Sequence, residues 1–400
     1  MACVTVRIGS GLSTGSDPRV AAIEAGTDAR QALHGRRADL VVVFGSGAHL
    51  AAPEATLEGV RESLDPRSLI GCGAGGVLAQ GREIERGTAV AVWAASFGDD
   101  DEARAAATVF RATAGSEASG GVIEGLPDCR GASAVLLVPD PYSFPADRAL
   151  NQIAEQAPGV PVVGGLSSAR TLDGGAALLA ADGVVGEGAV GVVLRGVDVL
   201  PCVSQGAAPI GPVLTVTAAR GHVIEEFNGR RALDTLRHTI DGLTAAQREA
   251  VVGGLLLGIA VGHGQHDVDS VMEGNHDRFL VRGIIGADPD AGTIAVGAAV
   301  APGCVVRLHV RDAHSAGLDL RAALKLRRRA LGGRAAGALV FTCNGRGRAM
   351  FDVADHDAGT VDQELDGVAA AGFMAAGEIG PVGGENFLHG FTATIAVFGS

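Results

Sequence analysis

The stretch TCNGRGRAMF (342–351) holds polar residues whose types and spacing suit ligand binding or catalysis. An apolar run ends there in Cys343 and Asn344, and Arg346 and Arg348 follow, separated by glycines that let the backbone approach a ligand. A guanidinium group holds a carboxylate through two parallel hydrogen bonds, and the N–H groups of a glycine-rich turn form an anion-binding nest. We therefore expect this turn to receive the carboxylate of a small ligand.

A second polar turn lies in the stretch AAGEIGPVGGENFLHGF, which places Gly377, Glu378 and His389 between two apolar runs. Burying a carboxylate without a partner is costly. Glu378 is therefore expected to pair either with the ammonium group of a ligand or with Arg346. His389 has three possible roles: it orients Glu378, it donates to the ligand, or it satisfies a backbone carbonyl.

Cys343 offers a catalytic alternative. Two arginines close in sequence favour its thiolate if they are also close in space. With His389 or Glu378 as the proton-transfer group, the thiolate would attack an acyl or amide bond. The other interpretation is a buried cysteine that acts as a small apolar side chain. Loss of the thiol would abolish turnover in an enzyme but leave ligand binding intact in a sensor.

Three further motifs carry weaker signals. GCGAGG (71–76) matches G-x-G-x-x-G, but no long helix follows it, so we interpret it as a tight turn rather than a nucleotide site. GGLSSA (164–169) approaches a nucleophile elbow, yet Ala169 replaces the last glycine and no helix begins there. HGQHDVDSVMEGNHD (263–277) holds possible metal ligands, but their spacing fits no known pattern. We predict neither a metal nor a cofactor.

The composition limits the classes of protein and of partner. A chain of 400 residues, 47% of them hydrophobic, exceeds what one core usually serves, so we expect two domains, 1–200 and 201–400. The net charge is −13 and the arginines form no basic stripe, which argues against nucleic acid. The most apolar run, 251–261, is too short to span a bilayer. Scattered cysteines without a CxxC pair fit the reducing cytoplasm.

One pattern recurs three times along the chain, at 39–98, 132–196 and 336–399. Each copy has a strand-like run, a helix-compatible stretch, a second short run that enters a small-residue turn, and a closing strand. The helix is clearest at 144–159, where Leu150 and Ile153 share a face. Such β-α-β-turn-β units predict the α/β class, with two domains of mixed sheets and packed helices.

The same motifs resemble a known family. CNGRG followed by AGFMAAGEIGPVGGENFLHGFTATIAVF is similar to the C-terminal FIST domain, and the stretches SGLSTGSDPRVAAIEAGTDARQAL, DLVVVFGSGAH and SLIGCGAGGVLAQGREIERGTAVAV are similar to the N-terminal one. The family usually has a G-C-T-x-x-G-E turn in its N-terminal half. In this chain Gly73 replaces the threonine and Val77 replaces the glutamate, so we expect no polar role for that turn.

The resemblance implies a cytoplasmic sensory protein that binds a small ligand such as an amino acid. Arg346 and the nearby backbone would take the carboxylate, and Glu378 would take the ammonium group. Members of the family are often attached to an output module, and none is evident in this chain, so we expect it to signal to an unidentified partner protein in trans. A cysteine-dependent enzyme and an interaction scaffold without a ligand are the alternatives.

Overall fold

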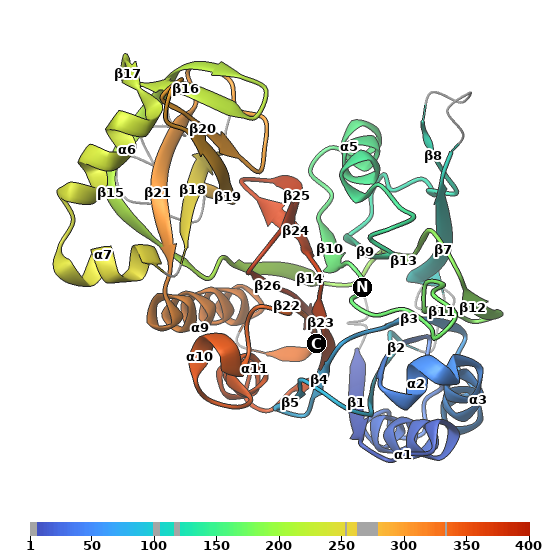
Figure 1. Cartoon of the computed structure of the whole chain (residues 1–400). Coiled ribbons are helices and arrows are strands. Elements are labelled where there is room, and N and C mark those ends of the chain that lie inside the picture. Colours follow the sequence, from blue (N-terminus) through green and yellow to red (C-terminus); the bar gives the residue numbers. More distant parts are fainter. Residues whose placement is uncertain (1–5, 99–104, 116–120, 253, 262–278, 333) are drawn as a thin grey trace. The chain divides into compact units, whose positions relative to one another are not determined.

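The computed structural model describes residues 6–98, 105–115, 121–252, 254–261, 279–332 and 334–400 (Figure 1). The chain folds into two compact units, Met1–Ser204 with Leu320–Ser400, and Gln205–Asp319. It returns to the first unit within the helix α9 (Ala313–Ala330). The two domains expected from the sequence, 1–200 and 201–400, are consecutive segments, and that division stays a prediction. The compact units are defined by contacts, and they group residues 320–400 with residues 1–204.

The larger unit contains three mixed sheets built on one plan. In each of them a first strand pairs in parallel with a second strand and antiparallel with a closing strand. The mixed α/β class with packed helices is therefore confirmed. The three sets of strands are β2 (Leu40–Ser46), β3 (Ser68–Gly73) and β6 (Ala89–Ser96); β9 (Ala134–Pro139), β10 (Val162–Gly165) and β13 (Ala189–Leu194); and β22 (Ala335–Cys343), β23 (Ala369–Ala375) and β26 (Ala393–Gly399).

Further strands extend each sheet beyond its closing strand, and helices follow the first strands. The added strands are β1 (Arg7–Ser13) beside β6, β7 (Ala107–Ala114) with β8 (Ile123–Glu124) beside β13, and β14 (Val199–Ser204) beside β26. Helix α1 (Pro18–Gln31) follows β1, and the helices that follow the first strands are α2 (Ala48–Ala51), α3 (Pro53–Leu64), α5 (Ala146–Gln156), α10 (Arg348–Phe351) and α11 (His356–Glu364). The helix expected at 144–159 is confirmed, with Leu150 and Ile153 buried on its inner face.

A hairpin follows the second strand of each set and joins a different sheet (Figure 1). The hairpin β4 (Val77–Ala79) with β5 (Arg82–Ile84) pairs with β23, and β11 (Leu178–Ala180) with β12 (Gly183–Val185) pairs with β3. The hairpin β24 (Glu378–Val382) with β25 (Glu385–His389) pairs with β10. The turns that enter these hairpins lie at the carboxyl ends of β3, β10 and β23, where the chain crosses from one sheet to another.

The core of this unit joins all three sheets. The first and closing strands are near-continuous apolar runs, as expected for strands covered on both faces. Aromatic rings from different sheets meet in it: the Phe44 and Phe373 ring centroids lie 5.0 Å apart, and those of Trp93 and Phe398 lie 4.9 Å apart. A single apolar cluster therefore holds the strand ends in place.

One glycine in each second strand permits close packing against the first strand. A Cβ atom at these positions would lie 1.8–2.0 Å from the carbonyl oxygen of the parallel neighbour, far inside the contact distance that real Cβ atoms keep. Only glycine therefore fits there. The three glycines are Gly71, Gly164 and Gly372.

The smaller unit is an antiparallel sheet whose ladder closes on itself, since β15 pairs with both β21 and β16. Thr244 and Gln247 form a capping box, because the Gln247 N–H donates to Thr244 Oγ1 at 3.3 Å and the Thr244 N–H donates to Gln247 Oε1 at 3.1 Å. The elements are β15 (Ala207–Arg220), β16 (Val223–Phe227), β17 (Arg230–Arg231), α6 (Ala232–Asp241), α7 (Ala245–Val252), β18 (Leu255–Ala260), β19 (Phe279–Asp288), β20 (Thr293–Val296) and β21 (Val305–Arg311).

Candidate functional site

The turns that follow β3, β10 and β23 contact one another directly. The Ser168 hydroxyl accepts a hydrogen bond from the Gly75 N–H at 2.9 Å and donates one to the Met374 carbonyl. The Leu166 N–H donates to the Gly377 carbonyl oxygen at 2.8 Å. Turns from three different sheets are thus tied together at one place.

The loop after β22 joins the same place. The Asn344 N–H donates to the Ala375 carbonyl oxygen at 2.9 Å, and a Cβ atom built at Gly75 would lie 3.9 Å from both Asn344 Oδ1 and Ser168 Oγ. Asn344, Gly75 and Ala376 are exposed there. The structure therefore brings together the two polar turns singled out in the sequence. We call residues 73–76, 166–170, 343–348 and 375–378 the strand-end cluster.

Glu378 is the fully buried carboxyl group of this cluster. Its Oε2 atom accepts hydrogen bonds from the N–H and the hydroxyl of Thr392, at 3.0 and 2.8 Å. No backbone or side-chain N–H or O–H group of the described residues donates to its Oε1 atom, and the neighbouring polar group is the Cys343 thiol. Burial raises the pKa of the carboxyl group to about 8, against the opposing effects of the Thr392 hydrogen bonds and the Arg346 charge. At neutral pH the group is mostly protonated and can both donate and accept.

Cys343 ends β22 beside this carboxyl group. The Gly345 N–H points at its sulfur at 3.4 Å. Burial and the neighbouring Glu378 charge raise the pKa of the thiol to about 11. Of the two interpretations of Cys343, the raised pKa favours the buried apolar side chain over the thiolate, because burial dominates and Arg346 is held by another carboxylate. The thiol is protonated at neutral pH and is a poor nucleophile.

The carboxylate that holds Arg346 is Asp357, in the first turn of α11. Arg346 Nε and Nη2 donate to Asp357 Oδ2 and Oδ1 at 2.6 and 2.8 Å, and both side chains are buried. Burial alone would raise the pKa of Asp357, but the charge and hydrogen bonds of Arg346 hold it well below the usual range, with help from His356 and Thr342. This edge of the guanidinium is therefore occupied within the protein.

The hairpin β4–β5, which comes from the first part of the chain and pairs with β23 of this sheet, fixes the ion pair. Glu83 Oε1 accepts hydrogen bonds from the backbone N–H groups of Asp357 and Ala358, at 2.8 and 2.9 Å, and so caps α11. Glu85 Oε1 accepts from the Arg348 N–H at 2.9 Å. Burial and the Asp357 charge raise the pKa of Glu83 to about 7. Glu83 and Glu85, from the first part of the chain, thus hold the loop after Cys343 and the start of α11 in place.

His389 lies opposite Glu378 in the register of the hairpin β24–β25. The ring is buried, and its Nε2–H donates to the Gly380 carbonyl oxygen at 2.9 Å. Three roles were considered for His389, and this contact corresponds to the third, a hydrogen bond to a backbone carbonyl. Gly377 contributes backbone, since its carbonyl oxygen accepts from Leu166.

Sequence reasoning missed Asp140 and Arg170 at the ends of β9 and β10, and considered Ser167 only as part of a near nucleophile elbow. Asp140 is fully buried; its Oδ2 accepts from the Ser143 hydroxyl at 2.7 Å and from Arg170 Nη2 at 3.3 Å. Its Oδ1 and the Ser167 hydroxyl make no hydrogen bond to any described residue. The signal that could have found them is the pair of polar turns, DPYS and SSAR, directly after two apolar runs.

Comparison with known proteins gives a consistent result over nearly the whole chain. The FIST N domain matches residues 39–230, and the FIST C domain matches residues 232–381. This chain belongs to the FIST family. It is 43% identical over 394 residues to the uncharacterized protein Mb0898c of Mycobacterium bovis and to the uncharacterized protein Rv0628c of Mycobacterium tuberculosis. Those matches cover 98% of this chain and 99% and 100% of the two relatives.

FIST domains are associated with sensing and signal transduction. The residues of interest lie mainly inside the match to the FIST C domain: Cys343, Arg346 and Glu378 fall within it, and His389 and Thr392 follow it. The strand-end cluster thus combines turns of the FIST N domain with loops of the FIST C domain.

The weaker motifs of this FIST chain have structural explanations. GCGAGG runs from β3 into the strand β4 rather than into a helix, so the tight-turn interpretation is confirmed. No helix begins after GGLSSA either. The histidine-rich stretch 263–277 lies outside the described residues, and elsewhere in the described chain no group of three or more potential metal ligands gathers. None of the described helices has the length and apolar character needed to cross a membrane.

Proposed function

We propose that this chain is a cytoplasmic sensory protein that binds a small polar metabolite, an amino acid or a compound of similar size, and signals to a partner protein in trans. The ligand would sit on the exposed rim of the strand-end cluster, against Asn344, Arg348 and the backbone of Gly377. Cys343 and Glu378 would lie beneath it. Arg346 would act indirectly, because its bidentate contact with Asp357 shapes the loop.

The observation that carries this proposal is the Oε1 atom of Glu378, a buried carboxyl oxygen to which no N–H or O–H group of the described residues donates. Leaving a buried polar atom unsatisfied costs about 1–3 kcal/mol. Asp140 Oδ1 and Ser167 Oγ are in the same state at neighbouring strand ends. A ligand that donates hydrogen bonds at this place would recover that cost.

A ligand amine fits Glu378 in a specific way. In the free protein the carboxyl group is mostly protonated at neutral pH, because burial raises its pKa to about 8. An ammonium group beside Oε1 would favour the ionised form and lower that pKa. Binding would then release a proton, which is a property that a ligand bound elsewhere would lack.

The test is a thermal-shift screen of the purified protein against amino acids and related metabolites. A ligand present at 100 times its dissociation constant should stabilise the fold by about 2.7 kcal/mol. We expect Glu378→Gln and Asn344→Ala to reduce the shift, and Glu58→Gln, an exposed change on α3, to leave it intact. The proposal fails if no compound stabilises the protein, or if the shift is unchanged in both variants of the cluster. A partner captured equally well with and without small molecules would then favour a scaffold.

A further inference from the structure

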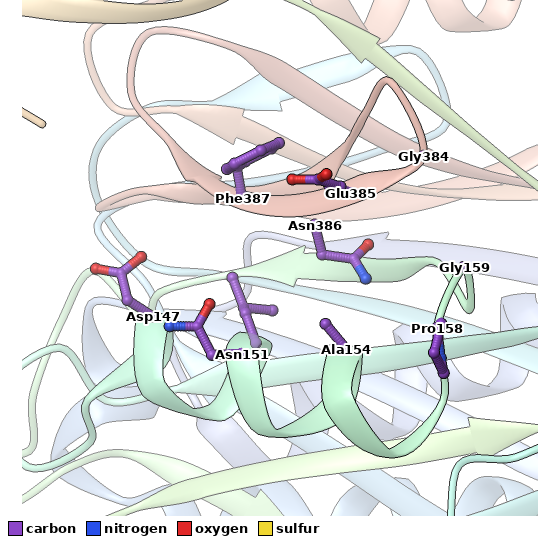
Figure 2. A pocket seen from close by; sticks show the side chains of 10 residues that line it. Asp147, Asn151, Ala154, Pro158, Gly159, Gly384, Glu385, Asn386 and Phe387 are labelled. Carbon is purple, nitrogen blue, oxygen red and sulfur yellow. The ribbon is translucent and has the colours of Figure 1, made fainter. Parts of the chain in front are cut away.

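The three sets of strands in the larger unit exchange their hairpins in a closed cycle. The hairpin that follows β3 pairs with β23, the one that follows β23 pairs with β10, and the one that follows β10 pairs with β3. Figure 2 shows the tip of one of them, β24–β25, beside α5 of the second set, with the Asn386 side chain directed toward that helix. The three sets thus have equivalent partners, and their residues can be matched one to one.

The same contacts fix this match in each set. A glycine of the second strand lies against one residue of the first strand, and the N–H group two residues after that glycine donates to the carbonyl oxygen just before the exchanged hairpin. These hydrogen bonds measure 2.7, 2.8 and 3.0 Å. In the order of the three sets, the glycines are Gly71, Gly164 and Gly372, their neighbours are Val43, Leu137 and Val340, the donors are Gly73, Leu166 and Met374, and the acceptors are Ala177, Gly377 and Gly76.

This match makes Asp140 the counterpart of Cys343. Each lies three residues after the matched residue of its first strand. The two side chains also point the same way, because the N–H group two residues later meets each of them. The Tyr142 N–H donates to Asp140 Oδ2 at 3.2 Å, and the Gly345 N–H points at Cys343 Sγ at 3.4 Å. The second set thus carries a carboxylate where the third carries the thiol of the candidate site.

The surroundings of Asp140 contain three buried polar atoms without a partner. Asp140 Oδ1, Ser167 Oγ and Arg170 Nε make no hydrogen bond to any described residue. Asp140 Oδ2, by contrast, accepts from the Ser143 hydroxyl at 2.7 Å. The Ser167 N–H donates to the Pro139 carbonyl oxygen at 2.9 Å, which holds Ser167 beside the end of β9. This strand end therefore offers an acceptor, a hydroxyl group and a donor that the protein leaves unused.

Arg170 covers this strand end and is held there weakly. Its Nη2 atom lies 3.3 Å from Asp140 Oδ2, slightly beyond the usual range for such a hydrogen bond. The Arg170 side chain is 36% exposed, and its guanidinium lies over the exposed ring of Tyr142, 4.6 Å from the ring centroid. A rotation of the Arg170 side chain would therefore open a path from solvent to Asp140 Oδ1.

The charges at this strand end are balanced, because Arg170 pairs with Asp140. A charged ligand group would leave one buried charge without a partner, which is costly. We propose that this strand end binds a small neutral ligand through a primary carboxamide group. The amide NH₂ would donate to Asp140 Oδ1, and the amide oxygen would accept from Arg170 Nε or from the Ser167 hydroxyl. Such a site at the second strand end is independent of the proposed function.

The experiment titrates acetamide into the full-length ¹⁵N-labelled protein and follows the backbone amide resonances by NMR. Acetone, which has the same shape but no N–H donor, and acetate, which is charged, are the comparison compounds. The variants are Ser167→Ala and Asp140→Asn, and the control is Ser16→Ala, which removes an exposed hydroxyl before α1. In Asp140→Asn the side-chain oxygen is needed at the Oδ2 position by its donors, so an NH₂ group replaces the acceptor Oδ1.

We expect acetamide to shift the resonances of Tyr142, Ser143 and Ser167 saturably in the wild type and in Ser16→Ala, and to bind both Ser167→Ala and Asp140→Asn about tenfold more weakly. Acetone and acetate should not saturate the wild type, whereas acetate should bind Asp140→Asn, because Arg170 then lacks its carboxylate. Without acetamide, Ser167→Ala should keep the melting temperature of the wild type, since its hydroxyl has no partner.

The proposal is overturned if acetamide does not saturate the wild type, if its shifts lie away from this strand end, or if acetone binds equally well. Unchanged affinity for acetamide in Ser167→Ala would overturn it too. That variant decides alone if Asp140→Asn fails to fold.

Discussion

Replacing Glu378 by glutamine should change how stability depends on pH. Glutamine keeps the shape of the side chain and an oxygen for the two Thr392 hydrogen bonds, but it cannot ionise. In the wild type, burial raises the pKa of the carboxyl group from 4.5 to about 8. Between these values the folded protein holds a proton that the unfolded chain has lost. The free energy of unfolding of the wild type should therefore fall, relative to the variant, as the pH rises through this range.

The size of the effect follows from the shift. Each unit of pKa difference corresponds to about 1.4 kcal/mol, so the full range amounts to roughly 5 kcal/mol as an upper value. Between pH 6 and pH 8, which is convenient to measure, the wild type should lose about 2 kcal/mol relative to the glutamine variant. Other titrating groups, Glu83 among them, affect both proteins alike and cancel in the difference.

The assay is urea unfolding of both proteins at pH 6, 7 and 8, followed by circular dichroism and analysed by linear extrapolation. Glu58→Gln is the control, because this exposed carboxylate on α3 should give a curve parallel to the wild type. A difference between wild type and Glu378→Gln that stays constant or grows in favour of the wild type from pH 6 to pH 8 would refute the reasoning. It would mean that Glu378 is ionised in the folded protein.

Three further predictions concern the surroundings of Glu378. Arg346→Met should cost about 3–5 kcal/mol in urea unfolding, because it leaves Asp357 as a buried charge without its bidentate partner; an unchanged midpoint would contradict the assigned ion pair. Gly372→Ala should prevent stable folding, since its Cβ would lie 1.8 Å from a carbonyl oxygen, while Gly390→Ala, with no atom within 4 Å of the added carbon, should leave the melting temperature nearly unchanged. Cys343 should react slowly with iodoacetamide at pH 7, as followed by peptide mass spectrometry, because its pKa is raised to about 11; rapid labelling would indicate a thiolate.

Local patterns predicted the elements well, because the information for them lies within a few residues. The spacing of Leu150 and Ile153 predicted α5. Apolar runs that end in glycine marked the paired strands. The mixed sheets followed from the alternation of strands, helices and turns.

The contacts of the site depend on pairings between distant parts of the chain. Nothing local shows that the hairpin at 77–84 joins β23, or that Glu83 caps a helix more than 270 residues later. Arg346 was expected to pair with a ligand or with Glu378, and its partner is Asp357. Asp357 lies in the first turn of the helix α11, which follows the glycine-rich turn. Its contact with Arg346 therefore depends on how the chain between them folds back. The raised pKa values likewise arise from burial, which the sequence shows only indirectly.

The most direct test of the account is an NMR titration of the Glu378 carboxyl carbon in protein labelled with ¹³C at the glutamate side chain, with Glu378→Gln used for assignment. The account predicts a midpoint near pH 8 in the free protein, and a downward shift of that midpoint when the most stabilising amine-bearing compound of the screen saturates the protein. A midpoint near 4.5, or a resonance that saturation with the compound leaves unchanged, would contradict the claim that a ligand meets this carboxyl group at the strand-end cluster.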